Sequence, residues 1–343
     1  MSRAIITGIT GQDAAYLADL LLGKGYTVFG TYRSHGTRNF WRIEELGIKE
    51  HPNLHLLEFE ATGLQVCVDL LTETGATELY NLAGQSSAVA SLAEPLATAL
   101  ANGMSPQYLL EAIRLESPAT RFFQASSSEL FGQAQQVPQL ETTPFNPTSP
   151  YGVAKLFAHW ATVNYREAYG LFAACGILFN HESPLRGSDF VTRKITTALG
   201  GINVGKQQVL ELGNMDAKRD WGYAKDYTYG MWSALQASEP DTFLFATNQM
   251  HTVREFVTLA GNAAGFNLRW EGSAENEVGI DDNSGRTVVR VNPDLYRPME
   301  IHLRVGNPGK ALKKLAWKPT TPLKQLCEMM VEADILRIRR ASS

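Results

Sequence analysis

A turn with regularly spaced small residues, placed between an apolar run and a helical segment, most constrains the fold of this chain. Residues 4–6 are apolar, Gly8, Gly11 and Ala14 follow in G-x-x-G-x-x-A spacing, and residues 17–22 have helical periodicity. Small residues allow a tight turn and a close approach of the backbone to a ligand at a helix N-terminus. The pattern therefore predicts a strand, a tight turn and a helix. The alternative is an ordinary strand–turn–helix that happens to use glycine.

Strand-like runs alternate with helical periodicity through much of the chain. This alternation is typical of an α/β protein with a Rossmann-type, doubly wound parallel sheet. The predicted strands are residues 4–6, 27–32, 54–59, 79–82, 122–125, 173–178 and 243–246, and the clearest helical segments are 17–22, 64–72, 108–114 and 223–236.

This regularity fails between about residues 180 and 219, and again between 263 and 304. We therefore predict a smaller, discontinuous substrate-binding domain in the C-terminal part of the chain. The predicted dinucleotide-binding domain comprises residues 1–180 and about 220–262, and the predicted nucleotide-sugar-binding domain comprises about 181–219 and 263–343.

Composition limits the classes of partner. The 343 residues are 44% hydrophobic with a formal net charge of −4, so no basic field favours nucleic acid or an anionic membrane. No apolar stretch reaches the ~18 residues that a membrane helix needs. Cys67, Cys175 and Cys327 are scattered without metal-ligand spacing, and the strand-like N-terminus leaves no room for a signal peptide. We expect a cytoplasmic protein without a metal site.

The small-residue turn favours a dinucleotide, because a pyrophosphate fits the N-terminus of the helix that follows Gly8 and Gly11. A free ribose 2′-hydroxyl is usually met by an acidic residue about 20 residues further on. The chain instead has Arg33 and Arg38 after the second strand, and arginines suit a 2′-phosphate. NADP is therefore favoured over NAD, the alternative being a solvated basic loop.

Candidate catalytic residues follow the fifth strand. That strand ends near Ser127, and Tyr151 and Lys155 lie four residues apart on a predicted helix, so they share one face. An ammonium beside a phenol lowers the phenol's pKa from about 10, which makes Tyr151 a usable base for a sugar hydroxyl. Lys155 can also bind the cofactor ribose. The alternative is a pair of surface residues on an amphipathic helix.

Glu129 indicates chemistry beyond hydride transfer. It lies two residues after Ser127, and in a site that excludes water a carboxylate there can move a proton to and from carbon. The alternative is a glutamate at the strand end that faces solvent.

Together these motifs are similar to those of the extended short-chain dehydrogenases/reductases, and longer runs resemble the GDP-mannose 4,6-dehydratase family over nearly the whole chain. The runs that carry this resemblance are residues 7–13, 80–83, 85–86, 124–130, 176–187, 190–194, 212–222 and 296–300.

The resemblance implies a hydro-lyase that oxidises carbon 4 of the sugar, eliminates water across carbons 5 and 6, and returns the hydride from NADPH to carbon 6. Tyr151 would accept the proton of the 4-hydroxyl, Ser127 would hydrogen-bond the 4-oxygen, and Glu129 would remove the hydrogen at carbon 5. The product would be GDP-4-keto-6-deoxy-mannose, and NADP would be regenerated in each turnover.

The resemblance also implies two sets of binding residues and no metal. The cofactor set is Gly8, Gly11, Gln12, Asp13, Arg33, Glu60, Leu82, Ala83, Tyr151, Lys155, His181 and Arg186. The set for the GDP-sugar is Gln85, Ser86, Asn180, Thr192, Lys194, Gly213, Arg219, Arg297 and Glu300. Arg219 with Asp220, and Arg297 with Glu300, could alternatively form structural ion pairs. The family also implies a homodimer or homotetramer that pairs through the Tyr151 helix and the helix near residues 106–114.

Departures from the family pattern leave the substrate open. Glu60 replaces an aspartate, Ser34 replaces the second of two adjacent arginines, and Ser87-Ala88 replaces a histidine and its neighbour. Loss of the imidazole beside the hexose keeps GDP-manno-heptose as an alternative substrate. A GDP-4-keto-sugar reductase or epimerase is less favoured, and a non-catalytic nucleotide-sugar-binding protein least of all.

Overall fold

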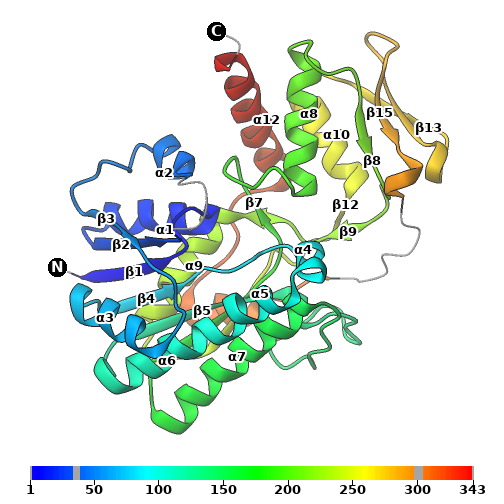
Figure 1. Ribbon diagram of the computed structural model, residues 1–343. Coiled ribbons are helices and arrows are strands. Elements are labelled where there is room, and N and C mark those ends of the chain that lie inside the picture. The colour runs from blue at the N-terminus through cyan, green and yellow to red at the C-terminus, as the bar shows by residue number, and fades with distance from the viewer. Residues whose placement is uncertain (1, 34–38, 297–303, 342–343) are drawn as a thin grey trace. The chain divides into compact units, whose positions relative to one another are not determined.

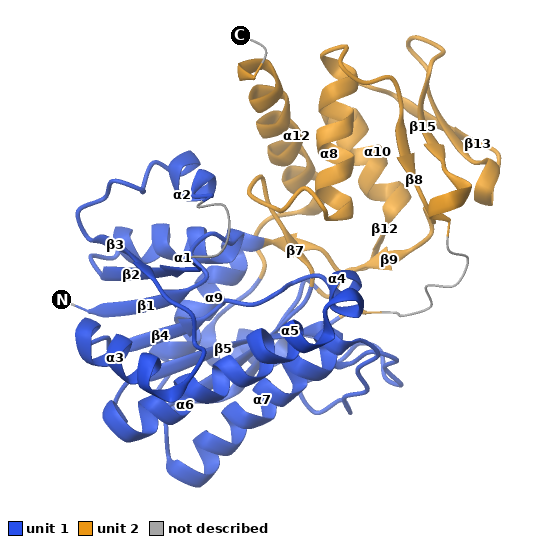
Figure 2. Ribbon diagram, in the orientation of Figure 1, with its two compact units in different colours: residues 1–179, 224–247, 306–318 blue, residues 180–223, 248–305, 319–343 orange. Residues whose placement is uncertain are grey.

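The computed structural model describes residues 2–33, 39–296 and 304–341. The chain forms two compact units, each assembled from three segments (Figure 2). Unit 1 comprises Met1–Phe179, Ala224–Thr247 and Gly306–Lys318, and unit 2 comprises Asn180–Tyr223, Asn248–Val305 and Pro319–Ser343.

Unit 1 is built on a seven-stranded, fully parallel sheet, which confirms the predicted α/β class (Figure 1). In spatial order the strands are β11 (Thr242–Phe245), β6 (Ala173–Leu178), β5 (Arg121–Ser127), β4 (Glu78–Asn81), β1 (Arg3–Thr7), β2 (Thr27–Tyr32) and β3 (Leu54–Glu58). The chain changes direction across the sheet between β1 and β4, and the carboxyl ends of strands at such a switch point are where ligands bind in open α/β sheets.

Helices cover both faces of this sheet (Figure 1). The helices α1 (Gln12–Gly23), α9 (Ala224–Gln236) and α11 (Gly309–Leu315) lie on one face, and α3 (Leu64–Thr74), α6 (Ser105–Glu116) and α7 (Pro150–Tyr169) lie on the other. Because both faces are covered, the central strands β4 and β6 are buried at every residue. Shorter helical segments are α2 (Trp41–Glu45), α4 (Ala88–Ala93), α5 (Pro95–Ala99) and a π-helical turn at Leu100–Met104.

Unit 2 packs three helices against a small mixed sheet. The helices are α8 (Val191–Asn203), α10 (Val253–Ala263) and α12 (Leu323–Arg340), and the strands, in spatial order, are β13 (Leu268–Glu271), β14 (Val278–Asp281), β15 (Thr287–Val291) and β8 (Leu210–Leu212). Apolar side chains from the helices and the sheet share one core, which includes Ile195, Phe256, Val289 and Met330.

Residues 180–219 and 263–304, where the strand–helix alternation fails, nevertheless contain regular elements. The first stretch contains the thirteen-residue helix α8, and the second contains β13, β14 and β15. Two adjacent glycines lie inside α8, although glycine is unfavourable inside helices. A Cβ added to Gly200 would lie 3.4 Å from side-chain carbons of Ile335 and Ile338, so α8 packs closely against α12 at this position.

The observed units also differ from the predicted domain boundaries at two places. The whole of α10 lies in unit 2, because its apolar face packs against α8 and α12. Residues 306–318 lie in unit 1, because α11 packs against β11 and α9. None of the helices in the described part of the chain is long and apolar enough to span a membrane.

Candidate active site

The small-residue turn after β1 has the geometry that its sequence predicts. Gly8 adopts a positive φ of 76°, and a Cβ on it would come within 2.9 Å of the Cα of Ala83. The Gly11 amide donates to the Gly8 carbonyl at 2.9 Å, and Gly11 is the N-cap residue of α1. The backbone therefore turns tightly at a helix N-terminus, which is what a dinucleotide pyrophosphate requires.

A ladder of buried polar side chains holds this turn against the neighbouring strands. The Thr7 hydroxyl accepts hydrogen bonds from the amides of Leu82 at 3.0 Å and Ala83 at 2.9 Å. It donates to Asn81 at 2.9 Å, and Asn81 in turn donates to Gln124 at 2.9 Å. The ladder joins the last residues of β1 and β4 to the middle of β5, so it fixes the loop after β4 relative to the glycine turn.

The remaining predicted cofactor residues of unit 1 lie at the same edge of the sheet. Gln12 is buried and Asp13 is half-buried in the first turn of α1. Arg33 is exposed directly after β2, and Glu60 is half-buried just after β3. Ser34 and Arg38 lie outside the described residues.

Lys155 is a buried cation on α7. Its side chain is only 6% exposed, and Nζ donates to the carbonyl of Ala125 at 2.9 Å. Burial lowers the pKa of Lys155 to about 8, partly opposed by the negative charge of Asp13. Nζ lies 6.0 Å from the centroid of the Tyr151 ring, one helical turn away. At neutral pH a positive charge therefore lies on the same helix face as the phenol, as the spacing predicts.

Ser127 and Glu129 lie where β5 ends and a short 3₁₀ turn begins. Both are half-buried, and the Ser127 hydroxyl accepts a hydrogen bond from the Glu129 amide at 3.2 Å. The first turn of α7 packs directly on this segment, because a Cβ on Gly152 would come within 2.9 Å of the Glu129 carbonyl oxygen. The glycine beside Tyr151 thus lets the helix begin close to the serine and the carboxylate.

The loop after β4 carries Gln85 and Ser86, the residues predicted to contact the sugar. Asn102 holds this loop: its side-chain oxygen accepts from the Gln85 amide at 2.9 Å, and its side-chain nitrogen donates to the Gln85 carbonyl at 2.8 Å. The Gln85 side chain donates to the Ser87 carbonyl at 2.6 Å. The Ser87 hydroxyl accepts from the Ala90 amide at 3.2 Å, so it caps α4.

In unit 2, Glu182 is the centre of a small charged cluster. Glu182 is 1% exposed, and it accepts a 2.5 Å hydrogen bond from the Thr192 hydroxyl. Nε of Arg186 lies 3.0 Å from the same carboxylate, an ion pair without hydrogen-bond alignment. The Arg186 guanidinium lies 3.4 Å from the centroid of the Phe190 ring. Thr192 is fully buried and its hydroxyl serves Glu182, which sequence reasoning did not anticipate.

Two further predicted residues lie beside Glu182. His181 belongs to β7 (His181–Glu182), which pairs in parallel with β10 (Gly222–Tyr223). The carbonyl of Asn180 accepts a hydrogen bond from the Gly222 amide at 2.9 Å. His181 is buried and Asn180 is half-buried.

The other predicted GDP-binding residues belong to different elements of unit 2. Lys194 is exposed on the first turn of α8, and Arg219 belongs to β9 (Lys218–Arg219), which pairs with β12 (His251–Thr252). Gly213 follows β8, where any side chain would meet the carbonyl oxygen of Leu295. Arg297 and Glu300 lie outside the described residues.

A protein-family model described as GDP-mannose 4,6 dehydratase matches residues 5–330. The chain belongs to this family. Among curated relatives, the GDP-mannose 4,6-dehydratase of Yersinia enterocolitica is 44% identical over 99% of this chain and 95% of the relative. The human GDP-mannose 4,6 dehydratase is 46% identical over 98% of this chain and 92% of the relative.

Solved structures with the same fold are more distant in sequence from this member of the GDP-mannose 4,6 dehydratase family. The UDP-glucose 4-epimerase of Thermotoga maritima with UDP-glucose superposes with a TM-score of 0.81 at 20% identity, covering 99% of this chain and all of the other. The dTDP-glucose 4,6-dehydratase of Bacillus anthracis in complex with NAD gives 0.77 at 18% identity, covering 97% and 96%. These likenesses establish the fold alone.

Sequence reasoning missed the residues that hold the site of this family member in place. Arg42 of α2 donates to the carbonyl of Thr10, inside the glycine turn, at 2.6 Å. Thr7 and Asn102 act on loops that are far from them in the sequence. No local pattern indicates these contacts, because each joins segments that only the tertiary fold brings together.

Proposed function

We propose that this protein is a GDP-mannose 4,6-dehydratase, a hydro-lyase that forms GDP-4-keto-6-deoxy-mannose. The observation that carries the proposal is the close packing of the Ser127–Glu129 turn against the first turn of α7, the helix on which Tyr151 lies one turn before the buried Lys155 ammonium. Relatives that are 44% and 46% identical over nearly the whole chain carry this enzyme's name.

NADP is the proposed cofactor. The Gly8 turn and the N-terminus of α1 suit its pyrophosphate, and the buried Lys155 ammonium suits a ribose hydroxyl. Arg33 is exposed at the end of β2, where a cation favours a 2′-phosphate over a free hydroxyl. When bound, NADP supplies the oxidant for carbon 4 and, once reduced, the reductant for carbon 6.

The first proton transfer is assigned to Tyr151. As a phenolate it accepts the proton of the sugar 4-hydroxyl when carbon 4 is oxidised. The Lys155 ammonium on the same helix face stabilises that phenolate. The Ser127 hydroxyl donates a hydrogen bond to the 4-oxygen, which polarises the ketone that forms there.

The elimination is assigned to Glu129. The 4-ketone acidifies the hydrogen at carbon 5, and the Glu129 carboxylate takes that proton as the bond between carbon 6 and its oxygen breaks. The leaving hydroxide takes up the proton that Tyr151 removed from the 4-hydroxyl, so it departs as water and Tyr151 is again a phenolate. When carbon 6 is then reduced, the protonated Glu129 returns its proton to carbon 5, so acid, base and cofactor all end in their starting states.

Recognition of the nucleotide is assigned to unit 2. We propose that Lys194, Arg219 and Arg297 neutralise the pyrophosphate of GDP, and that Asn180 and Glu300 accept or donate hydrogen bonds to its remaining polar groups. Arg186 and His181 are proposed cofactor contacts. The Thr192 hydroxyl already donates to Glu182, so we propose that Thr192 holds Glu182 in place and does not bind the nucleotide.

The decisive experiment is a turnover assay of the purified protein with GDP-mannose and no added cofactor, followed by mass spectrometry. We expect a product lighter by one water, with no net consumption of NADPH. A product that instead gains hydrogen only when NADPH is supplied would identify a reductase.

GDP-manno-heptose is the second candidate substrate. The observation that favours it is Ser87, a small side chain used to cap α4 where the family has a bulkier imidazole. The same assay with GDP-manno-heptose decides between the two sugars, because kcat/KM for the true substrate should be at least about tenfold higher.

We also propose a homo-oligomer that pairs through α7. Val153, Phe157 and Trp160 are 56%, 47% and 54% exposed, and their spacing places them along one face of this helix. An apolar stripe of this kind, exposed on one chain, suits burial against a second copy. A reducing, cytoplasmic location is proposed on the basis of three cysteines that are buried as free thiols.

A further inference from the structure

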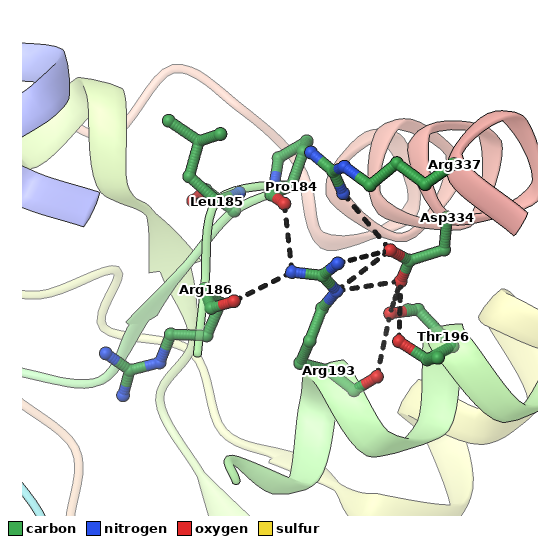
Figure 3. A network of polar contacts seen from close by, with 9 residues as sticks. Pro184, Leu185, Arg186, Arg193, Thr196, Asp334 and Arg337 are labelled. Carbon is green, nitrogen blue, oxygen red and sulfur yellow. Dashed lines mark hydrogen bonds and ion pairs between the residues drawn. The ribbon is translucent and has the colours of Figure 1, made fainter. Parts of the chain in front are cut away.

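Arg193 is a buried arginine that joins three segments of unit 2. It is 9% exposed and lies in the first turn of α8, between Thr192 and Lys194. Nε lies 2.9 Å from both carboxylate oxygens of Asp334 on α12, and Nη2 lies 2.6 Å from one of them. Nη1 donates to two backbone carbonyls, that of Pro184 at 3.1 Å and that of Arg186 at 2.7 Å (Figure 3).

Asp334 is as fully engaged as Arg193. It is 2% exposed, and besides Arg193 it accepts hydrogen bonds from Thr196 at 2.7 Å, Thr197 at 3.1 Å and Arg337 at 3.1 Å. A buried charge is tolerated only when it is paired and hydrogen-bonded, so loss of either partner leaves the other without compensation. The pair therefore holds its segments in one arrangement.

The loop that follows β7 is shaped by this pair. The Arg186 amide donates to the Ser183 carbonyl at 3.0 Å, and the Leu185 amide donates to the Ser183 hydroxyl at 3.0 Å. Arg193 then fixes the outer side of the turn through the carbonyls of Pro184 and Arg186. In Figure 3 the Arg186 carbonyl points at Arg193 while its guanidinium points away. The direction of the Arg186 side chain thus depends on a backbone that Arg193 holds.

The same anchor sets the rotation of α8. Arg193 turns inward to α12, so its neighbour Lys194 projects to the exposed side of the helix. Lysine could not replace Arg193, because one ammonium cannot span a carboxylate and two carbonyls as the planar guanidinium does.

We propose that Arg193 and Asp334 are positioning residues for anion recognition in unit 2. They do not contact the ligand themselves; they hold residues 184–186 and the first turn of α8 so that Arg186 and Lys194 present their charges to the phosphate groups of a nucleotide bound by unit 2. This proposal rests on the proposed function for the identity of those phosphates.

The test compares Arg193→Lys and Asp334→Asn with Val331→Ala, a core truncation on the same helix α12 that leaves the network intact. For both network variants we expect KM for GDP-mannose to rise about tenfold while kcat stays within about twofold of wild type. Val331→Ala should lower Tm without raising KM. If the network variants leave KM unchanged, or if Val331→Ala raises it equally, the proposal fails.

Hydrogen exchange of the ligand-free protein separates this proposal from the proposed function. Asp334→Asn should speed exchange of the Leu185 and Arg186 amides, whereas Val331→Ala should not. If exchange is faster in Asp334→Asn but the wild-type protein does not convert GDP-mannose, the positioning role is supported and GDP-mannose is rejected as the substrate. Unchanged exchange overturns the positioning role even if the wild type is a dehydratase.

Should both network variants fail to fold, Thr196→Val removes one donor to Asp334, and we expect it to raise KM about threefold.

Discussion

At the scale of single residues, Lys155 is a proposed catalytic group whose burial lowers the stability of the folded protein. Its pKa falls to about 8 on folding, from an ordinary value of 10.5. The folded state therefore disfavours the ammonium, and at pH 7 this lowers the free energy of unfolding by about 3 kcal/mol. The penalty is present in full below pH 8 and disappears as the pH rises toward the unfolded pKa. Yet the ammonium is the form that stabilises a Tyr151 phenolate.

We predict that Lys155→Met makes the protein more stable and much less active. Urea unfolding at about pH 7 should give a higher free energy of unfolding, because the buried charge is gone. kcat for GDP-mannose should fall by about a hundredfold or more. Lys49→Met, which removes a surface ion pair with Glu44, is the matched control and should change neither quantity appreciably. A variant that keeps wild-type kcat would remove Lys155 from the mechanism.

His159 is a second buried titratable residue near the catalytic strand end. It is 2% exposed on α7, and its Nδ1 lies 2.9 Å from the hydroxyl of Ser126. Burial, with a smaller contribution from the charge of Arg166, lowers the pKa of His159 to about 4. The imidazole is therefore neutral in the folded protein and joins α7 to β5 by a neutral hydrogen bond.

This depressed pKa predicts a loss of stability in mild acid. The unfolded chain takes up a proton on His159 near the ordinary histidine pKa of 6.5, whereas the folded chain does so only near 4. The stabilisation that depends on neutral His159 is complete above about pH 6.5. Below that pH the free energy of unfolding decreases by about 1.4 kcal/mol per pH unit, and the total loss near pH 4 is about 3 kcal/mol. Urea unfolding as a function of pH should show this slope, and His159→Gln should flatten it. An equal slope in the variant would assign the acid sensitivity to other groups.

At the scale of elements, the start of α7 sets how close Tyr151 comes to the catalytic strand end. A Cβ on Gly152 would lie 2.9 Å from the Glu129 carbonyl oxygen and 3.0 Å from Cβ of Pro147. We predict that Gly152→Ala pushes the helix and the Glu129 turn apart. kcat should fall at least about tenfold, since small displacements of reacting groups are costly.

The control for that variant is Gly23→Ala in α1, where an added Cβ meets nothing within 4 Å. This change should raise stability by about 0.5–1 kcal/mol through helix propensity and leave kcat unaltered. If Gly152→Ala retains full kcat, close packing of α7 on the Glu129 turn is not needed for turnover.

Elements whose signal is local could be predicted from the sequence, and elements that depend on packing could not. The seven strands of unit 1 appear as buried apolar runs, and all seven were placed to within two residues at each end. In unit 2, α8 carries Gly200 and Gly201 in its interior, and β8 is only three residues long. The helix α8 packs against α12 and β8 pairs with β15, and both partners come from much later in the chain, so their own sequence gave little indication of these elements.

At the scale of the whole molecule, the exposed apolar face of α7 makes a prediction about assembly. Trp160→Glu places a charge in this face, and we expect it to convert the proposed homo-oligomer to a monomer in size-exclusion chromatography with light scattering. Leu336→Glu, at a leucine of α12 that is 51% exposed, is the matched control and should leave the mass unchanged. A Trp160→Glu protein with the wild-type mass would exclude α7 as the interface.

Local patterns in the sequence predicted the central sheet and the candidate catalytic residues. A glycine turn, a Tyr–Lys pair four residues apart and a glutamate after a strand are local patterns, and strand alternation indicates a parallel sheet because it is also local. The tertiary structure alone decided what holds those groups in place. Three hydrogen-bonded pairs show this. Asn102 and Gln85 are 17 positions apart, Arg42 and Thr10 are 32 apart, and Asp334 and Arg193 are 141 apart. A buried polar contact over such separations leaves no periodicity in the sequence, because its partners meet only when the chain has folded.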